Sequence, residues 1–220
     1  MKERDRKSKI EPRWPVALTL ILIILLNYAL PSRIALFPAW IAYPIGLIML
    51  FPILMVGITS GSPKWLKIEK IILHSAAILI GLSNCVNLTR LTESMIMNTQ
   101  DVSGIVLLTS SIAIWALNVM IFSLIYWQLD RGGPESRITG GEKLPSWLFP
   151  QDSAPEGTIP TGWRPQFPDY LYLSYSTATA FSTTEVAPVT IRAKMLMMLE
   201  SLISLVTILM VAARAINILT

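Results

Sequence analysis

Polar and ionisable residues recur along the last long apolar stretch of the chain, where such residues are costly. Their steps of four, three, four and three residues place them on one helical face. This stripe consists of Glu200, Ser204, Thr207, Val211 and Arg214. A charge at the bilayer centre costs about 2.5–3.5 kcal/mol on insertion scales. The stripe therefore predicts either the lining of an aqueous pore or a face that packs against another helix.

Glu200 is the member of this stripe that most needs a partner. We expect it to pair with Arg192, to pair with Arg90 of a neighbouring helix, or to coordinate a cation. The single histidine, His74, is typical of a hydrogen-bonded packing residue, and the single Cys85 allows neither an intrachain disulfide nor a cysteine metal cluster. Nucleotide-binding glycine loops, paired histidines and nucleophile motifs are missing. The sequence therefore predicts no enzyme, no catalytic residue, no metal site and no cofactor.

Residues 168–190, PDYLYLSYSTATAFSTTEVAPVT, form an unusual segment just before this stretch. Pro168 and Asp169 are typical of a helix start, where the helix dipole favours a negative charge. The next dozen residues are aromatic, aliphatic or hydroxyl-bearing, too few to cross a bilayer but enough to reach its middle. Non-helical backbone at that depth needs protein or water to satisfy its polar groups. We therefore expect a re-entrant helix before the last span.

Residues 177–190 resemble the pore loop of tetrameric potassium channels, in which T-x-T-T is followed by V-G-Y-G-D, two variable residues, Pro, one more residue and Thr. Thr177, Thr179, Pro188 and Thr190 match, and Glu185 replaces the Asp. Both filter glycines are missing, so the potassium-selective carbonyl ladder should not form. The resemblance implies that hydroxyl and carboxylate groups coordinate ions with weak selectivity. The filter-like segment comprises Thr179, Phe181, Ser182, Thr183, Thr184 and Glu185.

A broader resemblance covers much of the second half of the chain. It rests on WQLDRGGP at Trp127–Pro134, PSWLFPQ at Pro145–Gln151, WRPQFPDYLYLSYSTATAFS at Trp163–Ser182 and VAARAINIL at Val211–Leu219. These motifs are similar to a family of uncharacterised bacterial integral membrane proteins, a domain of unknown function. The resemblance implies a multi-pass protein of the bacterial plasma (inner) membrane and implies no particular activity.

The composition is that of a bilayer protein: 53% of the 220 residues are hydrophobic, 15% are charged, and the mean hydropathy is +0.56. A transmembrane helix needs about 20 mostly apolar residues. Five stretches meet or approach this length, at about 14–30, 34–58, 70–92, 104–128 and 195–219. The predicted fold is an all-α membrane protein with five transmembrane helices plus a re-entrant pore-like helix before the last span.

Four regions follow from this pattern. We expect a basic cytoplasmic tail at 1–13, a four-helix transmembrane region at 14–128, a Pro/Gly-rich capping loop at 129–167, and the pore-like helix, filter-like segment and final span at 168–220. The capping loop lacks periodicity, but its tryptophans and phenylalanines supply apolar surface. We therefore expect it to be ordered over one face of the membrane.

The basic residues predict an orientation. With five spans and a cytoplasmic amino terminus, fifteen of the eighteen Lys and Arg residues face the cytoplasm, and only Arg33, Arg90 and Arg214 face outward. The basic tail is then a topology signal, and no nucleic-acid partner is expected. This orientation places the capping loop and the pore-like segment on the cytoplasmic side.

Further polar side chains, three amides and one guanidinium group, also lie within the predicted spans. Asn84, Asn87 and Arg90 follow one another at steps of three, and Asn118 lies in the middle of the fourth span. Such groups commonly hydrogen-bond between helices. We expect a polar seam inside the bundle.

Two functions remain open from the sequence. One is an ion-channel-like protein with a weakly selective pore for monovalent cations. A single re-entrant loop cannot close a pore, so this function requires a homo-oligomer, a tetramer by the channel resemblance. The alternative is a non-conducting structural or regulatory membrane protein whose pore-loop-like segment is a plug. Ion flux through the purified protein separates the two.

Overall fold

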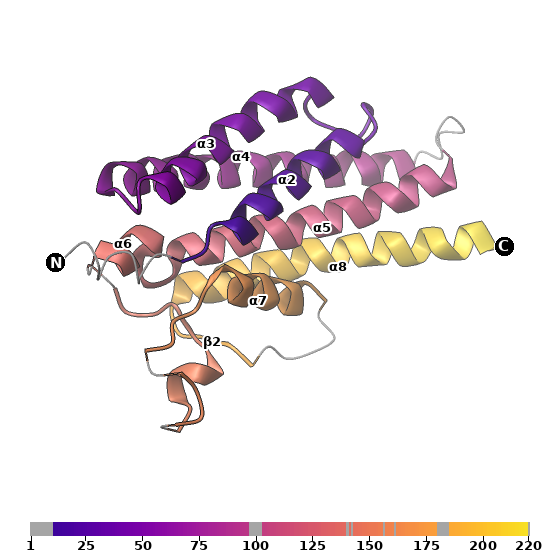
Figure 1. The fold of residues 1–220 in the computed structure, drawn as a ribbon. Helices are drawn as coiled ribbons and strands as arrows, with labels where there is room; N and C mark the ends of the chain where they lie inside the picture. The colour runs from indigo at the N-terminus through magenta and orange to yellow at the C-terminus, as the bar shows by residue number, and fades with distance from the viewer. Residues whose placement is uncertain are drawn as a thin grey trace.

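The structure, a computed structural model, consists mainly of helices that run alongside one another (Figure 1). It describes residues 11–96, 103–139, 141, 143–155, 157–160, 162–179 and 185–219, with only the backbone for residue 139 and residues 214–219. The long helices are α2 (Trp14–Ala29), α3 (Ala42–Ile58), α4 (Pro63–Ile96), α5 (Gly104–Leu129) and α8 (Ile191–Leu219). The shorter elements are η1 (Ala39–Ile41), η2 (Asp130–Gly132), α6 (Gly133–Thr139), β1 (Trp147–Leu148), η3 (Pro150–Ser153), α7 (Phe167–Thr179) and β2 (Ala187–Pro188).

Four of the helical stretches in the described part of the chain are long and apolar enough to cross a membrane. They cover Ala39–Ile58, Pro63–Ile96, Gly104–Ile138 and Ile191–Ala213. A fifth apolar helix, α2, is shorter at 16 residues. This architecture is compatible with a multi-pass membrane protein.

The second apolar run was predicted to be helical from residue 34, and this boundary is wrong. Residues 31–38 form a turn in which the amides of Ile34 and Ala35 both donate to the carbonyl of Pro31, each at 2.9 Å. The helical path begins only at Ala39, because Pro38 lacks an amide and disfavours helical geometry in the residue before it. The third and fifth helices extend beyond the predicted runs, since polar residues continue both of them.

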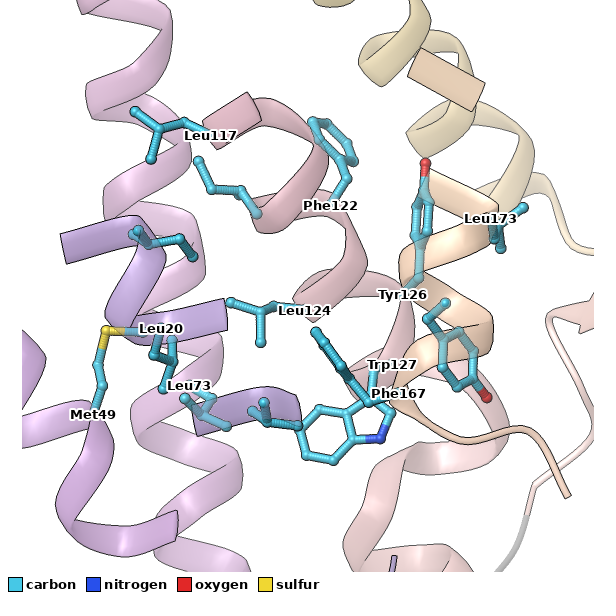
Figure 2. Close-up of a cluster of buried hydrophobic side chains, with 14 of the residues drawn as sticks. Leu20, Met49, Leu73, Leu117, Phe122, Leu124, Tyr126, Trp127, Phe167 and Leu173 are labelled. Atoms are coloured by element: carbon cyan, nitrogen blue, oxygen red, sulfur yellow. The ribbon is translucent and has the colours of Figure 1, made fainter. Parts of the chain in front are cut away.

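The core is centred on α5, which packs against α4, α7 and α8. Leu117 and Leu124 of α5 meet apolar residues of the neighbouring helices, and Trp127 lies at its lower end beside Phe167 (Figure 2). Polar residues of α5, such as Ser111 and Asn118, are buried, whereas large apolar side chains elsewhere are widely exposed. Burial of polar groups beneath an apolar surface is the pattern expected of a helix bundle surrounded by lipid.

One end of the bundle, here called the capped end, carries the start of α2, α6, the paired strands and the start of α8 (Figure 1). The carboxyl end of α8 lies at the opposite end. Strand β1 pairs antiparallel with β2, with Trp147 opposite Pro188. The region predicted as a capping loop without regular elements therefore contains η2, α6, β1 and η3, and one of its strands holds the chain that leads into α8.

Candidate functional site

A short helix, α7, is present at the start of the segment predicted to be re-entrant, and it lies beside α5 and α8 (Figure 1). Its start is capped by Asp169, whose carboxylate accepts the amide of Gln166 at 2.7 Å, half of a capping box. Its last turn is satisfied by α8, because the Ser201 hydroxyl donates to the carbonyl of Thr177 at 3.3 Å. Both ends of this short helix are therefore held by specific polar contacts.

Glu200 lies at the centre of the α5–α7–α8 junction and is fully buried. Its two carboxyl oxygens are hydrogen-bonded to the hydroxyls of Tyr126 on α5 and Ser174 on α7. Ser174 also donates to the carbonyl of Val119, 2.7 Å away. The prediction that Glu200 pairs with a basic residue is wrong for the described side chains, where its partners are hydroxyl groups and Arg192 is exposed at the surface. This site joins three helices through one carboxyl group.

Asn118 extends this junction along α8. Its side-chain nitrogen lies 2.8 Å from the Ser204 hydroxyl and 3.2 Å from the backbone carbonyl of Glu200. Thr207, the next residue of the stripe, is also fully buried and donates to the carbonyl of Ile203. The polar face of α8 thus points into its own chain, which fits the packing alternative rather than the lining of a pore for Glu200, Ser204 and Thr207. A lining role needs side chains that face out of the chain toward a shared axis.

The remaining site predictions are only partly covered by the structure. Val211 is partly buried, and the side chain of Arg214 lies outside the described residues. Of the filter-like segment, Thr179 ends α7 and is partly buried, and Glu185 is exposed just before β2. The other four members, Phe181, Ser182, Thr183 and Thr184, lie outside the described residues.

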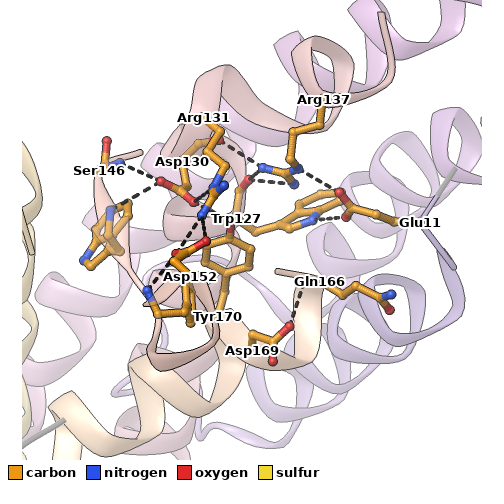
Figure 3. A network of polar contacts seen from close by, with 12 residues as sticks. Glu11, Trp127, Asp130, Arg131, Arg137, Ser146, Asp152, Gln166, Asp169 and Tyr170 are labelled. Atoms are coloured by element: carbon orange, nitrogen blue, oxygen red, sulfur yellow. Dashed lines mark hydrogen bonds and ion pairs between the residues drawn. The ribbon is translucent and has the colours of Figure 1, made fainter. Parts of the chain in front are cut away.

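A second polar cluster, absent from the predicted sites, lies at the capped end around Asp130 (Figure 3). This carboxylate is fully buried. It accepts the Tyr170 hydroxyl and the backbone amide of Ser146, both at 2.7 Å, and Arg131 lies 3.4 Å away. Burial raises the pKa of the Tyr170 phenol well above its ordinary value, so the hydroxyl keeps its proton and donates. Asp130 thereby ties the end of α5 to the start of α7 and to the strand-bearing loop.

Arg137 connects Glu11, which precedes α2, to the cluster around Asp130. It forms an ion pair with Glu11 at 2.7 Å and donates to the carbonyls of Trp127 and Asp130 (Figure 3). Glu11 also accepts the indole N–H of Trp127 at 2.7 Å. Arg13 stacks over the Trp127 ring, 5.1 Å from its centroid, with Nε of Arg13 3.1 Å from Glu69. These buried pairs hold α2, α4, α5 and α6 together.

The polar seam predicted on the third span is confirmed as a set of packing contacts. Asn84 donates to the carbonyl of Ile114 on α5 at 3.2 Å, and Asn87 accepts the amide of Leu36 at 2.8 Å. Arg90 donates to the carbonyl of Ala35 at 2.7 Å. These side chains satisfy backbone groups of α5 and of the turn before α3. His74 makes a similar contact with the backbone, a 3.0 Å bond to the carbonyl of Lys70.

An apolar pocket lies between α2, α3 and α4, and none of its lining residues belongs to either polar cluster. Its lining is aliphatic apart from Phe37 and the polar groups of Asn27 and Ser83. Within the described residues, no group of three or more His, Cys, Asp and Glu side chains could hold a metal ion. Three acidic side chains are buried among the described residues: Glu69 is paired with Arg13, whereas Glu200 and Asp130 are hydrogen-bonded to hydroxyl groups.

No family model, curated protein or solved structure matches the chain.

Proposed function

We propose that the chain crosses the membrane five times, with α2 as the fifth span beside the four longer helices. The 16 residues of α2 reach roughly 24 Å at 1.5 Å per residue, close to a core of about 30 Å. Exposed aromatic rings flank it: Trp14 at its start and Tyr28 near its end. Such rings prefer the membrane interfaces. The capped end carries the basic residues Lys70, Arg131 and Arg137. In this proposal it lies on the cytoplasmic side of a bacterial plasma membrane.

In this proposal α7 is re-entrant, and one observation carries the idea. Its 13 residues extend only roughly 20 Å, too short to cross. The Tyr170–Asp130 bond holds the first turn at the capped end, and the chain beyond the filter-like segment is back at that end in β2, paired with β1. The segment therefore starts and finishes at the same end of the bundle.

The function that this arrangement supports best is that of an ion-channel-like protein. Helices α5 and α8 flank α7 in the order helix, short helix, loop, helix, which agrees with the pore-loop resemblance of residues 177–190. Copies of the chain, four by that resemblance, would surround a path lined by the hydroxyls of residues 182–184 and the carboxylate of Glu185. Tyr172 and Tyr175 of α7 are exposed. Their rings give α7 an apolar surface that can contact a neighbouring copy of the chain.

A non-conducting role is the second candidate, and burial of the α8 stripe favours it. Glu200, Ser204 and Thr207 are each fully buried within one chain. Beyond the filter-like segment, α8 then offers a permeating ion an apolar surface that includes Met198, 65% exposed, and Leu202, 60% exposed. In this alternative α7 is a fixed plug in a structural or regulatory protein.

Cation flux into proteoliposomes separates the two candidates. Glu185→Gln and Thr183→Ala should lower flux several-fold, because each removes a proposed ion ligand. Glu93→Gln is the matched control, since Glu93 is an exposed carboxylate at the far end of α4 and its substitution should leave flux unchanged. Flux unaltered by both test substitutions would contradict the proposed path. A monomer in mild detergent, measured by light scattering, would contradict a shared pore.

A further inference from the structure

The carboxyl group of Glu200 sits at a depth where a negative charge is expensive. Glu200 is nine residues beyond the start of α8, or about 14 Å along the helix axis. In the five-span arrangement proposed above, this depth is near the middle of a hydrocarbon core about 30 Å thick. A charge at that position costs about 2.5–3.5 kcal/mol on insertion scales. The surroundings of Glu200 must therefore either compensate the negative charge of a carboxylate or keep the carboxyl group protonated and neutral.

Counting the hydrogens at Ser174 shows which form the surroundings suit. The Ser174 hydroxyl has one hydrogen but lies within bonding distance of two oxygens, the Val119 carbonyl at 2.7 Å and one carboxyl oxygen of Glu200. A carbonyl oxygen can only accept. If Ser174 donates to Val119, the contact with Glu200 is a hydrogen bond only when Glu200 donates, and Glu200 donates only when it carries a proton.

The protonated form uses every group at the site. The carboxylic O–H of Glu200 donates to Ser174, Ser174 donates to Val119, and Tyr126 donates to the second carboxyl oxygen. An ionised Glu200 cannot donate, so the single Ser174 hydrogen bonds either to the Val119 carbonyl or to the carboxylate. One of the two hydrogen bonds is then lost. A chain of hydrogen bonds running in one direction also polarises its members and strengthens them.

The surrounding elements provide no compensating cation among the described side chains. The facing group from α5 that can titrate is the Tyr126 phenol, and the contact from α7 is the neutral Ser174. Asn118 reaches the backbone carbonyl of Glu200 with a neutral amide. On α8 itself, Arg192 and Lys194 are exposed at the capped end. The carboxyl group therefore has hydroxyl partners and no described ion-pair partner.

We propose that Glu200 is a proton-binding site: it carries a proton at neutral pH, and the neutral acid fastens α7 between α5 and α8. When the proton leaves for solvent, the Ser174 hydrogen turns from the Val119 carbonyl to the carboxylate. An unpaired negative charge then remains at depth, and the hold on α7 weakens. The inference rests on the five-span placement proposed above, but it does not require ions to pass.

Infrared spectroscopy of the wild-type protein in liposomes tests the inference directly. A protonated carboxyl group has a C=O band separate from the amide band. We expect this band at neutral pH, and we expect Glu200→Gln to remove it. Gln imitates the protonated acid, since its NH₂ donates to Ser174 and its oxygen accepts from Tyr126, so this variant should keep the wild-type fold. Absence from the wild-type spectrum of a band that depends on Glu200 would overturn the inference.

A chemical test on the wild-type chain avoids dependence on any variant. Dicyclohexylcarbodiimide partitions into membranes, and its N=C=N group adds to a protonated carboxyl group, with rearrangement to an N-acylurea that retains every atom of both reactants. We expect this adduct at Glu200 by peptide mass mapping. A water-soluble carbodiimide with a glycine ester should modify the exposed Glu93 and leave Glu200 unmodified. The absence of the dicyclohexyl adduct at Glu200 would count against a protonated acid.

These outcomes are separable from those for ion conduction. The infrared band and the adduct are measured on the protein at rest, so they are expected even if Glu185→Gln leaves cation flux unchanged. Conversely, flux that depends on Glu185 while Glu200 gives neither band nor adduct would overturn the proton-binding site and leave the pore intact.

Discussion

Removal of the Asp130 carboxylate should destabilise the capped end more than removal of the Tyr170 hydroxyl that donates to it. Asp130 is fully buried and accepts hydrogen bonds from the Tyr170 hydroxyl and the Ser146 amide, with a weaker contact from the Trp147 amide at 3.4 Å. In Asp130→Ala these donors lose their acceptor, and Arg131 loses a nearby negative charge. A buried donor left unpaired costs about 1–3 kcal/mol.

The expected losses in the free energy of unfolding follow from the number of donors left unpaired. Two strong donors and one weakened charge pair give about 3–5 kcal/mol for Asp130→Ala. Asp130→Asn keeps an oxygen for the Ser146 amide, so we expect about 1–3 kcal/mol. Tyr170→Phe deletes one donor and leaves Asp130 its backbone partners, so we expect about 0.5–1.5 kcal/mol.

Unfolding in mixed micelles, titrated with a denaturing detergent, measures these losses. Tyr172→Phe is the matched control, because Tyr172 is on the same helix but 57% exposed, and its change should stay within about 0.5 kcal/mol. Equal losses for Tyr170→Phe and Tyr172→Phe would refute the assigned hydrogen bond. An Asp130→Ala protein as stable as wild type would refute the view that this cluster holds the capped end together.

Three further predictions concern the same end of the bundle. Arg137→Ala should cost about 3–5 kcal/mol of unfolding free energy, because it removes the 2.7 Å ion pair with Glu11 and the donor to the carbonyls of Trp127 and Asp130. Arg137→Lys should restore only part of this loss, since an ammonium group cannot reproduce the forked contacts; equal stability of the two variants would contradict this. Trp147→Ala should lower the free energy of unfolding by about 3–5 kcal/mol, because Trp147 is fully buried. The control Leu148→Ala should lower it by under about 1 kcal/mol, because Leu148 is 41% exposed. Similar losses for the two variants would contradict tight packing at the capped end. In a Cys85→Ser background, a cysteine replacing the exposed Ser153 should resist membrane-impermeant labelling in intact cells, and rapid labelling would reverse the proposed orientation.

The helices were predictable from sequence because a long apolar run that must satisfy its own backbone in lipid has few alternatives to a helix. Their boundaries were less predictable. The sequence from residue 34 onward is apolar on both sides of Pro38, so its composition does not mark where the helix begins. In the structure this stretch starts with a turn, and α3 begins only afterwards. At the start of α4, polar residues extended the helix because Glu69 had a partner in Arg13, which lies 56 residues earlier.

The polar sites were harder to predict, because hydrogen-bond partners depend on packing. Spacing correctly placed Glu200, Ser204 and Thr207 on one helical face, but it did not show that this face turns toward α5 and α7. Asp130 offered one signal, a carboxylate directly after a 26-residue apolar helix. The hydroxyl partners of Glu200 and Asp130 gave no signal in the sequence, since serine and tyrosine are common in such helices.

The central claim is that α7 and the segment after it enter and leave the membrane on one side. It is tested by accessibility of single cysteines at Gln166, just before α7, and at Ile191, the exposed first residue of α8, in the Cys85→Ser background. Ser32, in the turn after α2, is the reference for the opposite side. We predict that cysteines at Gln166 and Ile191 are labelled from the same side and that a cysteine at Ser32 is labelled from the other. Labelling of Gln166 and Ile191 positions from opposite sides would mean that the segment crosses the membrane and would contradict the account.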